Sequence, residues 1–236
     1  MVSEIMLQQT QTSRVSEKFL EFIKRFPDFN TLAKAPLEDI LNIWQGLGYN
    51  RRAIALKNIA EIIVSSYNGN LPADLDTLKS FPQIGYNTAS SILVFAFNIP
   101  TYFIETNIRR VYIYFFFQDK KIVNDKDVLK LTKKTIDLSN PRDWYYGLMD
   151  YGVMLKRNHP ELNKKSVHYQ KQSKFKGSNR EIRGEILKML LEEKALEEIE
   201  IIQKIDKNPE RVKKILNTMS KEGFIKKINQ NYTISD

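Results

Sequence analysis

The chain has 236 residues, a formal net charge of +9 and 42% hydrophobic residues. This composition allows one large domain, or one medium and one small domain, and it excludes global disorder. The chain contains no cysteine, so it cannot form disulfides, thiolate zinc sites or cysteine-ligated iron–sulfur clusters. Its longest apolar runs, ILVFAF and VYIYFFF, fall far short of the ~20 residues that span a bilayer. We therefore expect a cytoplasmic protein without a membrane partner.

The first 155 residues are predicted to form a series of short helices. Apolar residues recur with helical spacing from Val15 to Phe26, and this face ends at Pro27. A second helix is opened by Pro36. No strand-like alternation is found before residue 220, so we expect an all-α fold for this part. The remaining predicted helices lie near 56–67, 75–81, 87–97, 106–117, 124–139 and 142–155.

The C-terminal part has a different pattern. Helices are predicted at 180–193, 196–205 and 208–223, and residues 224–235 alternate like a hairpin with a polar turn at 229–231. Three helices followed by a hairpin are typical of a winged helix. The predicted organisation is therefore an all-α domain at 1–155, a linker at 156–177 and a small winged-helix domain at 178–236.

The positive charge is concentrated between the two predicted domains. Residues 156–180 carry eight basic side chains and one acidic side chain, whereas 181–236 carry 11 of each. Such a segment suits a polyanion such as nucleic acid, although a solvated linker explains it equally well. The third C-terminal helix adds four basic residues that could contact phosphates: Arg211, Lys213, Lys214 and Lys221. Alternatively, the neutral C-terminal domain could bind a protein partner.

Four collinear motifs carry a resemblance to a known family. They are VSEIMLQQTQ, WQGLGYNRRA, LPADLDTLKSFPQIGYNTASSIL and FIETNIRRV, which together cover roughly residues 2–155. In the third motif a tight turn, PQIG, joins two helices, and the backbone N–H groups of such a turn can hold one DNA phosphate. The chain resembles the helix–hairpin–helix DNA glycosylases, the superfamily of endonuclease III, and within it the adenine glycosylases of the MutY type.

The resemblance implies a catalytic role for three residues. Glu4 matches the glutamate that protonates the flipped adenine and positions water, a general-acid task. Glu105 matches a family aspartate that stabilises the positive charge developing on the sugar. Asn107 matches an asparagine that orients the carboxylate and the water. From the residues alone, Glu4 could be a solvated acid on a frayed helix, and Glu105 an acid favoured by the dipole at a helix start.

The resemblance also implies a set of DNA contacts. The amides after Glu4 would enter the duplex, Leu47 and Tyr49 would form a second wedge, and the hairpin would hold phosphate. Arg109 and Arg110 would contact phosphate or pair with a carboxylate, or they could face solvent. The predicted DNA-binding residues are Gln8, Gln9, Thr10, Leu47, Tyr49, Gln83, Ile84, Gly85, Asn87, Thr88 and Arg109.

The chain departs from the family pattern at several points. Gln83 stands where relatives carry a glycine, so the turn is either reshaped or weaker at binding phosphate. Asn87 stands where bifunctional relatives carry a lysine nucleophile, and an amide cannot form a Schiff base. The four cluster cysteines are absent, so we expect no iron–sulfur cluster and no other cofactor. His159 and His168 lack partners at metal-ligand spacing, so no metal site is expected.

These observations predict a monofunctional DNA glycosylase of base excision repair, associated with the nucleoid. Its expected substrate is duplex DNA carrying adenine mispaired with 8-oxoguanine or guanine. One alternative is a glycosylase that removes uracil or thymine from mismatches. The other is a DNA-binding protein without catalytic activity. The two carboxylates favour an enzyme, because a protein that only binds DNA gains nothing from acids facing phosphates.

Overall fold

The computed structural model describes residues 1–171 and 173–236, so Gln172 of the predicted linker lies outside the described residues. The chain divides into two compact units. The first contains residues 72–172 together with Met1, and the second contains 2–71 and 173–236. Each unit is built mainly from helices, which confirms the predicted fold class.

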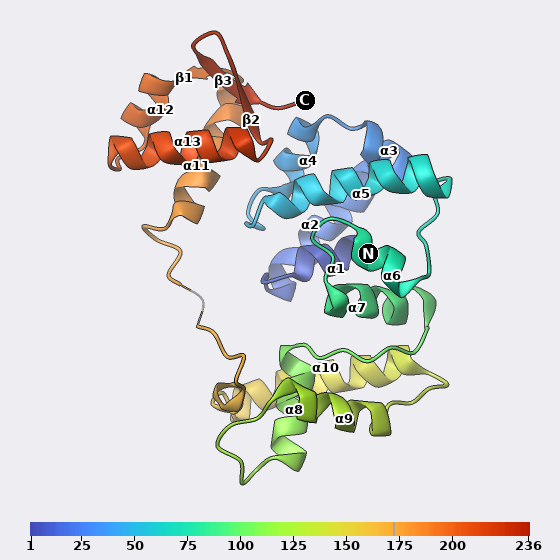
Figure 1. Cartoon of the computed structure of the whole chain (residues 1–236). Coiled ribbons are helices and arrows are strands. Elements are labelled where there is room, and N and C mark those ends of the chain that lie inside the picture. The colour runs from blue at the N-terminus through green and yellow to red at the C-terminus, as the bar shows by residue number, and fades with distance from the viewer. Residues whose placement is uncertain (172) are drawn as a thin grey trace. The chain divides into compact units, whose positions relative to one another are not determined.

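The described residues of the first unit form five α-helices and one short 3₁₀ helix. The helices α6 and α7 are joined by the PQIG turn, and α8 packs along α10 (Figure 1). The bounds are Leu75–Ser80 for α6, Tyr86–Phe97 for α7, Thr106–Phe116 for α8, Asp125–Thr135 for α9, Pro141–Asn158 for α10 and Leu162–Lys165 for η1.

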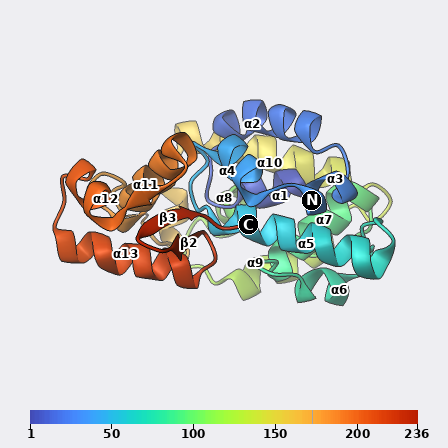
Figure 2. The same ribbon diagram turned by 90° about the horizontal axis from the view of Figure 1, so that it is seen from above.

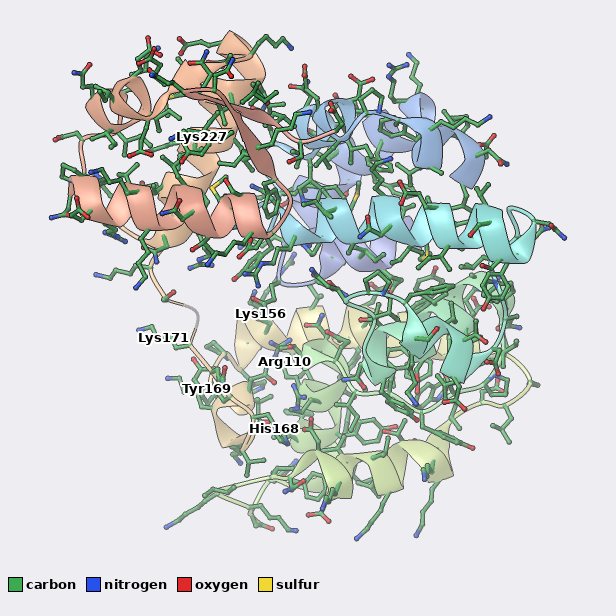
Figure 3. The ribbon with its side chains drawn as sticks, turned by 45° about the horizontal axis from the view of Figure 1, so that its top comes forward. Arg110, Lys156, His168, Tyr169, Lys171 and Lys227 are labelled. Carbon is green, nitrogen blue, oxygen red and sulfur yellow. The ribbon has the colours of Figure 1, made fainter. Side chains whose placement is uncertain are left out.

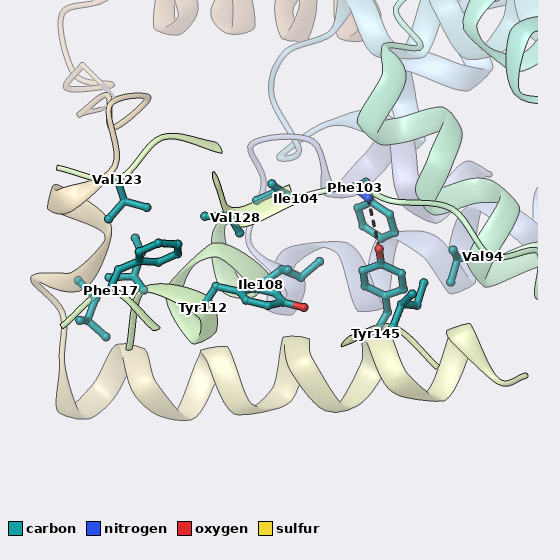
Figure 4. Close-up of a cluster of buried hydrophobic side chains, with 12 residues drawn as sticks. Val94, Phe103, Ile104, Ile108, Tyr112, Phe117, Val123, Val128 and Tyr145 are labelled. Carbon is teal, nitrogen blue, oxygen red and sulfur yellow. Dashed lines mark hydrogen bonds between the residues drawn. The ribbon is translucent and has the colours of Figure 1, made fainter. Parts of the chain in front are cut away.

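The core of this unit is formed by aromatic and branched side chains on α8 and its neighbours (Figure 4). Phe103 stacks on Tyr145, with ring centroids 4.2 Å apart. The Phe103 N–H donates a hydrogen bond to the Tyr145 hydroxyl over 3.2 Å, and that hydroxyl donates to the Thr101 carbonyl over 2.9 Å. These bonds satisfy buried polar groups and fix the segment that leads into α8.

The second unit contains the first five helices of the chain. Their bounds are Val2–Leu7 for α1, Thr12–Arg25 for α2, Phe29–Lys34 for α3, Leu37–Trp44 for α4 and Arg51–Tyr67 for α5. The helix α5 packs against α1, α3 and α4. It ends at Tyr67, near the predicted end, and Asn68 adopts a left-handed conformation as the helix C-cap.

The same unit contains the C-terminal helices and a small antiparallel sheet with the strand order β1-β3-β2. Figures 1 and 2 show α13 beside β2, which agrees with the packing of these elements. The assignment of these elements to a winged helix stays a prediction. The bounds are Asn179–Glu193 for α11, Leu196–Glu197 for β1, Glu198–Lys204 for α12, Pro209–Lys221 for α13, Ile225–Ile228 for β2 and Asn231–Ile234 for β3.

Several predicted boundaries differ from the observed ones: α5 begins at Arg51 instead of near 56, and α10 continues to Asn158 instead of 155. Two further differences have a local cause. Leu196 and Glu197 form a strand paired with β3 instead of the start of a helix, and α12 begins only at Glu198. The helix predicted to reach residue 139 ends at Thr135, because Ile136 is extended and Asp137 accepts three hydrogen bonds in the following turn. In both places a turn or a strand partner outweighs the helical spacing.

The predicted division at residues 155 and 178 stays a prediction. The compact units are defined by contacts between residues and do not follow the order of the chain. One of them groups residues 173–236 with the first five helices. In the described part of the chain, no helix has both the length and the apolar content needed to cross a membrane.

Candidate active site and nucleic-acid interface

Glu105 is the N-cap residue of α8 in the first unit. Its Oε1 accepts hydrogen bonds from the backbone N–H groups of Asn107, at 2.6 Å, and Ile108, at 2.9 Å. A side-chain oxygen at this position satisfies N–H groups that the first turn of a helix leaves without partners. The carboxylate is thereby held in one orientation by the backbone, while Oε2 makes no hydrogen bond with any of the described residues.

Burial raises the pKa of the Glu105 carboxyl above its ordinary value. The two backbone N–H groups oppose this shift, and the positive charges of Arg109 and Arg110 oppose it more weakly. The carboxylate therefore lies in a poorly hydrated place, with positive charge and N–H dipoles on one side. A carboxylate with little solvent around it can stabilise a cation that develops nearby more strongly than an exposed one.

Asn107 is fixed by the contact between α8 and α10. Its Oδ1 accepts a hydrogen bond from Arg110 Nη1 at 2.7 Å, and the same Nη1 donates to the Gly152 carbonyl at 2.6 Å. Gly152 lies so close that a Cβ added there would be 2.4 Å from the Asn107 carbonyl oxygen. The helix α10 therefore reaches the backbone of Asn107 only because residue 152 has no side chain.

The buried Asn163 of η1 completes this group. With its amide turned to suit its neighbours, its oxygen accepts from Arg110 Nη2 at 2.6 Å and its nitrogen donates to the Thr106 carbonyl at 3.3 Å. Arg110, which extends from α8 (Figure 3), is itself buried and joins Asn107, Gly152 and Asn163. Its hydrogen-bond acceptors among the described residues are amide and carbonyl oxygens, and it forms no salt bridge with a carboxylate there.

The hairpin between α6 and α7 presents the residues predicted to contact phosphate. Gly85 is the N-cap of α7, and Gln83 and Gly85 are exposed, whereas Ile84 is buried in the core. Gln83 adopts φ +59°, the left-handed conformation that relatives were expected to reach with a glycine. The turn is therefore formed in spite of the substitution, at the conformational cost of a non-glycine residue there.

Two further predicted DNA contacts of this unit have partners within the protein. The Asn87 side chain donates to the Ile104 carbonyl over 3.0 Å, so the start of α7 lies against the residue preceding Glu105. Arg109 binds the Asp125 carboxylate with two hydrogen bonds of 2.7 Å. Arg109 is thus paired with a carboxylate, one of the outcomes that the sequence left open. Thr88 is half-buried on the first turn of α7.

Glu4 lies on α1 in the second unit. The neighbouring Ile5 and Met6 are buried, and Glu4 is half-buried at the edge of the face that they form. The helix packs against α2 and α5, so its position is set by the core of the unit. Glu4 is therefore a residue of a packed helix and does not lie on a frayed end.

One buried arginine joins the two loops predicted to enter DNA. Arg52 on α5 donates to the carbonyl groups of Met6 and Gln8, both at 2.7 Å, and to that of Gly48 at 2.8 Å. It also donates to the Thr10 hydroxyl at 3.0 Å. Further acceptors of Arg52 are the carbonyl groups of Ile5, Leu47 and Tyr49.

Burial lowers the pKa of Arg52 to about 10, so its guanidinium remains charged at neutral pH. It packs over the rings of Trp44 and Tyr49, with its Cζ 5.4 and 5.6 Å from their centroids. A fork of five N–H donors can serve many carbonyl oxygens that converge on one point, which a lysine ammonium cannot do. Arg52 therefore fixes the backbone of the loop at 8–10 and of the loop at 45–49 together.

The tips of both loops hold left-handed residues. Gln9 has φ +55° and Tyr49 has φ +46°, and neither is a glycine. Gln9 is exposed, and Gln8, Thr10 and Tyr49 are half-buried, whereas Leu47 is only 4% exposed. Strained backbone in non-glycine residues persists where the surrounding structure fixes it, which is the role of Arg52 here.

Comparison with known proteins assigns the family of this chain. A model of the HhH-GPD superfamily of base excision DNA repair proteins matches residues 2–137. The chain belongs to this superfamily. The match includes both units' predicted functional residues, from the helix that carries Glu4 to the segment that carries Glu105 and Asn107.

Curated relatives of this superfamily member are adenine DNA glycosylases. That of Buchnera aphidicola subsp. Baizongia pistaciae is 38% identical over 167 residues, which are 69% of this chain and 47% of that protein. That of Mycolicibacterium smegmatis is 41% identical over 111 residues, which are 47% of this chain and 38% of that protein. The chain therefore spans less than half the length of these relatives.

Two solved structures share the fold of this chain. A thermostable thymine-DNA glycosylase aligns with a TM-score of 0.58 and 23% identity, covering 65% of this chain and 72% of that chain. Endonuclease III in a non-covalent DNA complex aligns with a TM-score of 0.53 and 20% identity, covering 67% of this chain and 72% of that chain. At these identities the likeness shows the fold alone.

The structure adds residues that the sequence interpretation missed. Arg52, Gly152 and Asn163 hold the predicted site residues in place, and none of them was predicted to do so. A signal for Arg52 was present, because it lies four residues before Leu56 on the apolar face of its helix, where an arginine needs buried partners. Nothing in the sequence pairs Gly152 or Asn163 with residue 107 or 110, which lie more than 40 positions away.

The basic segment after α10 is partly ordered by the first unit. Leu162 is buried, Lys165 donates to the Gln118 carbonyl over 2.8 Å, and the Val123 N–H donates to the Lys165 carbonyl over 2.8 Å. Figure 3 labels His168, Tyr169 and Lys171 of this segment, and Lys156 near the end of α10. The part of the chain outside position 172 contains no group of three His, Cys, Asp or Glu side chains that could hold a metal ion.

Proposed function

We propose that this protein is a monofunctional DNA glycosylase that removes adenine opposite 8-oxoguanine or guanine from duplex DNA. The observation that carries the proposal is the 38% identity to an adenine DNA glycosylase over 167 residues, within a chain whose family is base excision repair. The packed position of Glu4 and the oriented, poorly hydrated carboxylate of Glu105 support it.

In the proposed reaction Glu4 is the general acid. Breaking the bond between C1′ and the base leaves the electron pair on the purine, which departs poorly as an anion. A proton from Glu4 to a purine ring nitrogen makes the base a neutral leaving group. Water then adds to C1′ and loses a proton to the Glu4 carboxylate, so the acid is regenerated and the products are free adenine and an abasic site.

Glu105 stabilises the sugar while the bond breaks. C1′ and the ring oxygen become positively charged, and a carboxylate aimed at this charge lowers the barrier. Two backbone N–H groups hold Glu105 Oε1, which leaves Oε2 for this task. Asn107, held by Arg110 and by the approach of α10 at Gly152, would orient the carboxylate and the water.

The remaining predicted residues would bind DNA. The start of α7, capped by Gly85, supplies backbone N–H groups to one phosphate. Gln9 and Tyr49, on the loops that Arg52 fixes, would fill the gap left by the flipped base. Asn87 carries an amide and no amine, so no Schiff base forms at its position and the strand is not cut by the enzyme.

The proposal is tested with a panel of duplexes that each contain one mispair, assayed for abasic sites by strand cleavage after mild alkali. Adenine opposite 8-oxoguanine and opposite guanine should give cleavage. Uracil or thymine opposite guanine should not, and cleavage there would assign the protein to mismatch glycosylases of another specificity. If no duplex is cleaved, the proposed activity is wrong, and the remaining interpretation is a DNA-binding protein without glycosylase activity.

Two substitutions separate catalysis from binding. Glu4→Gln should reduce base release by about 10²–10⁴-fold while duplex affinity changes only a few-fold, because an amide cannot donate the proton. Glu17→Gln, an exposed glutamate on α2, is the matched control and should leave the rate unchanged. Equal turnover by Glu4→Gln would contradict the assignment of the general acid.

The absence of lyase chemistry has its own test. Borohydride should trap no covalent adduct between protein and DNA, and strand cleavage should appear only after alkali. A robust adduct would mean that a lysine reaches C1′ and that the reaction is not monofunctional.

A further inference from the structure

The C-terminal residues contact the loop that carries Tyr49. Both segments belong to the same compact unit. Among the described residues of this unit, three side-chain contacts join residues 173–236 to the part that contains α4, α5 and the loop between them: Arg180 with Tyr49, Glu222 with Arg51, and Lys194 with Glu38. Two of these three contacts fall on residues 49 and 51, at the end of the loop between α4 and α5.

The side chain of Tyr49 is held by two guanidinium groups. Its hydroxyl accepts a hydrogen bond of 2.7 Å from Arg180 Nη1. The Cζ of Arg180 lies 5.3 Å from the centre of the ring, and that of Arg52 lies 5.6 Å from it. Cations at such distances from an aromatic ring attract it, and the hydrogen bond adds a fixed direction.

Arg180 is itself anchored. Its Nη2 donates to the Ser173 carbonyl at 2.8 Å and to the Ser173 hydroxyl at 3.1 Å. It lies on the first turn of α11, which is capped by Ser178. The guanidinium that holds Tyr49 is therefore fixed by its own helix and by the segment that precedes that helix.

A second contact holds the backbone beside Tyr49. Glu222, at the C-terminal end of α13, accepts hydrogen bonds from Arg51 and Arg183. The hydrogen bond from Arg51 is the main cause that lowers the pKa of Glu222 below its ordinary value, so the carboxylate is charged at neutral pH. The guanidinium of Arg183 also lies over the Phe224 ring, 5.1 Å from its centre.

We infer that the C-terminal segment positions the DNA wedge, with Arg180 as a positioning residue for Tyr49 and the Arg51–Glu222–Arg183 group as its support. The inference rests on the proposed function, because it needs Tyr49 to enter a duplex. A tyrosine at a left-handed loop tip would otherwise sample several rotamers. Fixing the ring before DNA binds removes an ordering cost that would otherwise reduce base flipping.

The inference assigns the C-terminal segment a task other than phosphate binding. A domain that only adds phosphate contacts changes duplex affinity and its salt dependence. A domain that positions Tyr49 changes the flipping of the base and the rate of its release at a given affinity. These two effects can be separated by measuring binding and base release on the same variants.

The experiment compares Arg180→Met with Lys188→Met in the full chain. Both remove one positive charge from α11, but Lys188 is exposed and forms a salt bridge with Glu192, at 3.9 Å, on its own helix. The duplex carries 2-aminopurine beside an adenine opposite 8-oxoguanine, so that its fluorescence reports unstacking. Single-turnover base release and duplex affinity are measured on the same samples.

We expect Arg180→Met to lower the single-turnover rate and the fluorescence amplitude by about tenfold while the affinity stays within about threefold. Lys188→Met should change neither. Arg180→Lys should recover part of the loss, because an ammonium can still donate to the phenol. Once Tyr49→Phe has removed the acceptor hydroxyl, Arg180→Met should have a smaller further effect, so the two substitutions should be non-additive.

The outcomes distinguish the inference from the proposed function. If the wild-type protein unstacks the duplex in an Arg180-dependent way but releases no base, the proposed activity is wrong and the positioning role stands. If wild-type protein releases adenine and Arg180→Met does so as fast as Lys188→Met, the positioning role is overturned. Additive effects of Tyr49→Phe and Arg180→Met would also overturn it.

Discussion

Residues 105–110 are held by the packing of α8 against α10, whereas the backbone of the loops at 8–10 and 45–49 is joined by the side chain of Arg52. In the first region α10 approaches the backbone of Asn107 at Gly152, and the side chain of Glu105 is capped by N–H groups of its own helix. In the second region the acceptors of Arg52 come from the end of α1, from the loop that follows it and from the loop between α4 and α5.

The difference corresponds to the proposed tasks of the two regions. A carboxylate that stabilises charge at C1′ must be placed within fractions of an ångström, which close backbone packing provides. Side chains that enter a duplex must project from exposed loop tips, where little packing is available. A buried guanidinium gives these tips a fixed backbone without covering them.

The largest expected effect comes from breaking the second region. Arg52→Met should lower the free energy of unfolding by about 3–5 kcal/mol, because several carbonyl oxygens lose their donor at once. Urea unfolding measures this loss. Arg14→Met, an exposed arginine on α2, is the control and should change the free energy by no more than about 0.5 kcal/mol. Similar values for both variants would mean that Arg52 does not organise the loops.

A smaller effect is expected from breaking the first region at Gly152. Gly152→Ala should cost about 1–3 kcal/mol, because the new methyl group meets backbone atoms of Asn107 that cannot move without shifting α8. Gly147→Ala on the same helix is the control, since nothing lies within 4 Å of a Cβ there. That control should stabilise the protein by about 0.5–1 kcal/mol through higher helix propensity. A neutral Gly152→Ala would show that the helices are not in close contact at Asn107.

Glu105→Gln sharpens the comparison through its pH dependence. Burial raises the pKa of Glu105, so its contribution to stability is fully present below the unfolded pKa and is lost as the pH rises through the folded pKa. Glutamine does not titrate. The stability of Glu105→Gln relative to wild type should therefore increase from pH 4 to pH 7, measured as urea midpoints at each pH. If the stability of Glu105→Gln relative to wild type does not rise with pH, burial of the charged Glu105 carboxylate does not destabilise the protein.

The smallest expected effect concerns the hairpin. Gln83→Gly should stabilise the protein by at most about 1 kcal/mol, because glycine adopts the observed φ of +59° without the steric cost paid by glutamine. Thermal or urea unfolding measures this gain. A glycine at position 87 would relieve no such steric cost, because Asn87 lies within α7. A clear loss of stability would show that the Gln83 side chain contributes contacts that outweigh the strain.

Several features of this protein were determined by short-range signals in the sequence. The hairpin of α6 and α7, the left-handed end of α5 at Asn68 and the place of Glu105 at the start of α8 all depend on residues within four positions of one another. Caps and turns satisfy backbone N–H and C=O groups locally, so their characteristic residue types can be recognised in a single sequence. The four collinear motifs likewise predicted the family that the comparison assigns.

Other features were decided only by the tertiary structure. Arg109 pairs with Asp125, Arg110 holds Asn107 against Gly152, and Arg180 reaches Tyr49 across 131 positions of sequence. The same arginines could have bound phosphate or faced solvent, because a guanidinium suits all three environments. The choice depends on which carboxylates, carbonyl groups and rings the packing of the helices brings within reach, and no spacing along the chain encodes that distance.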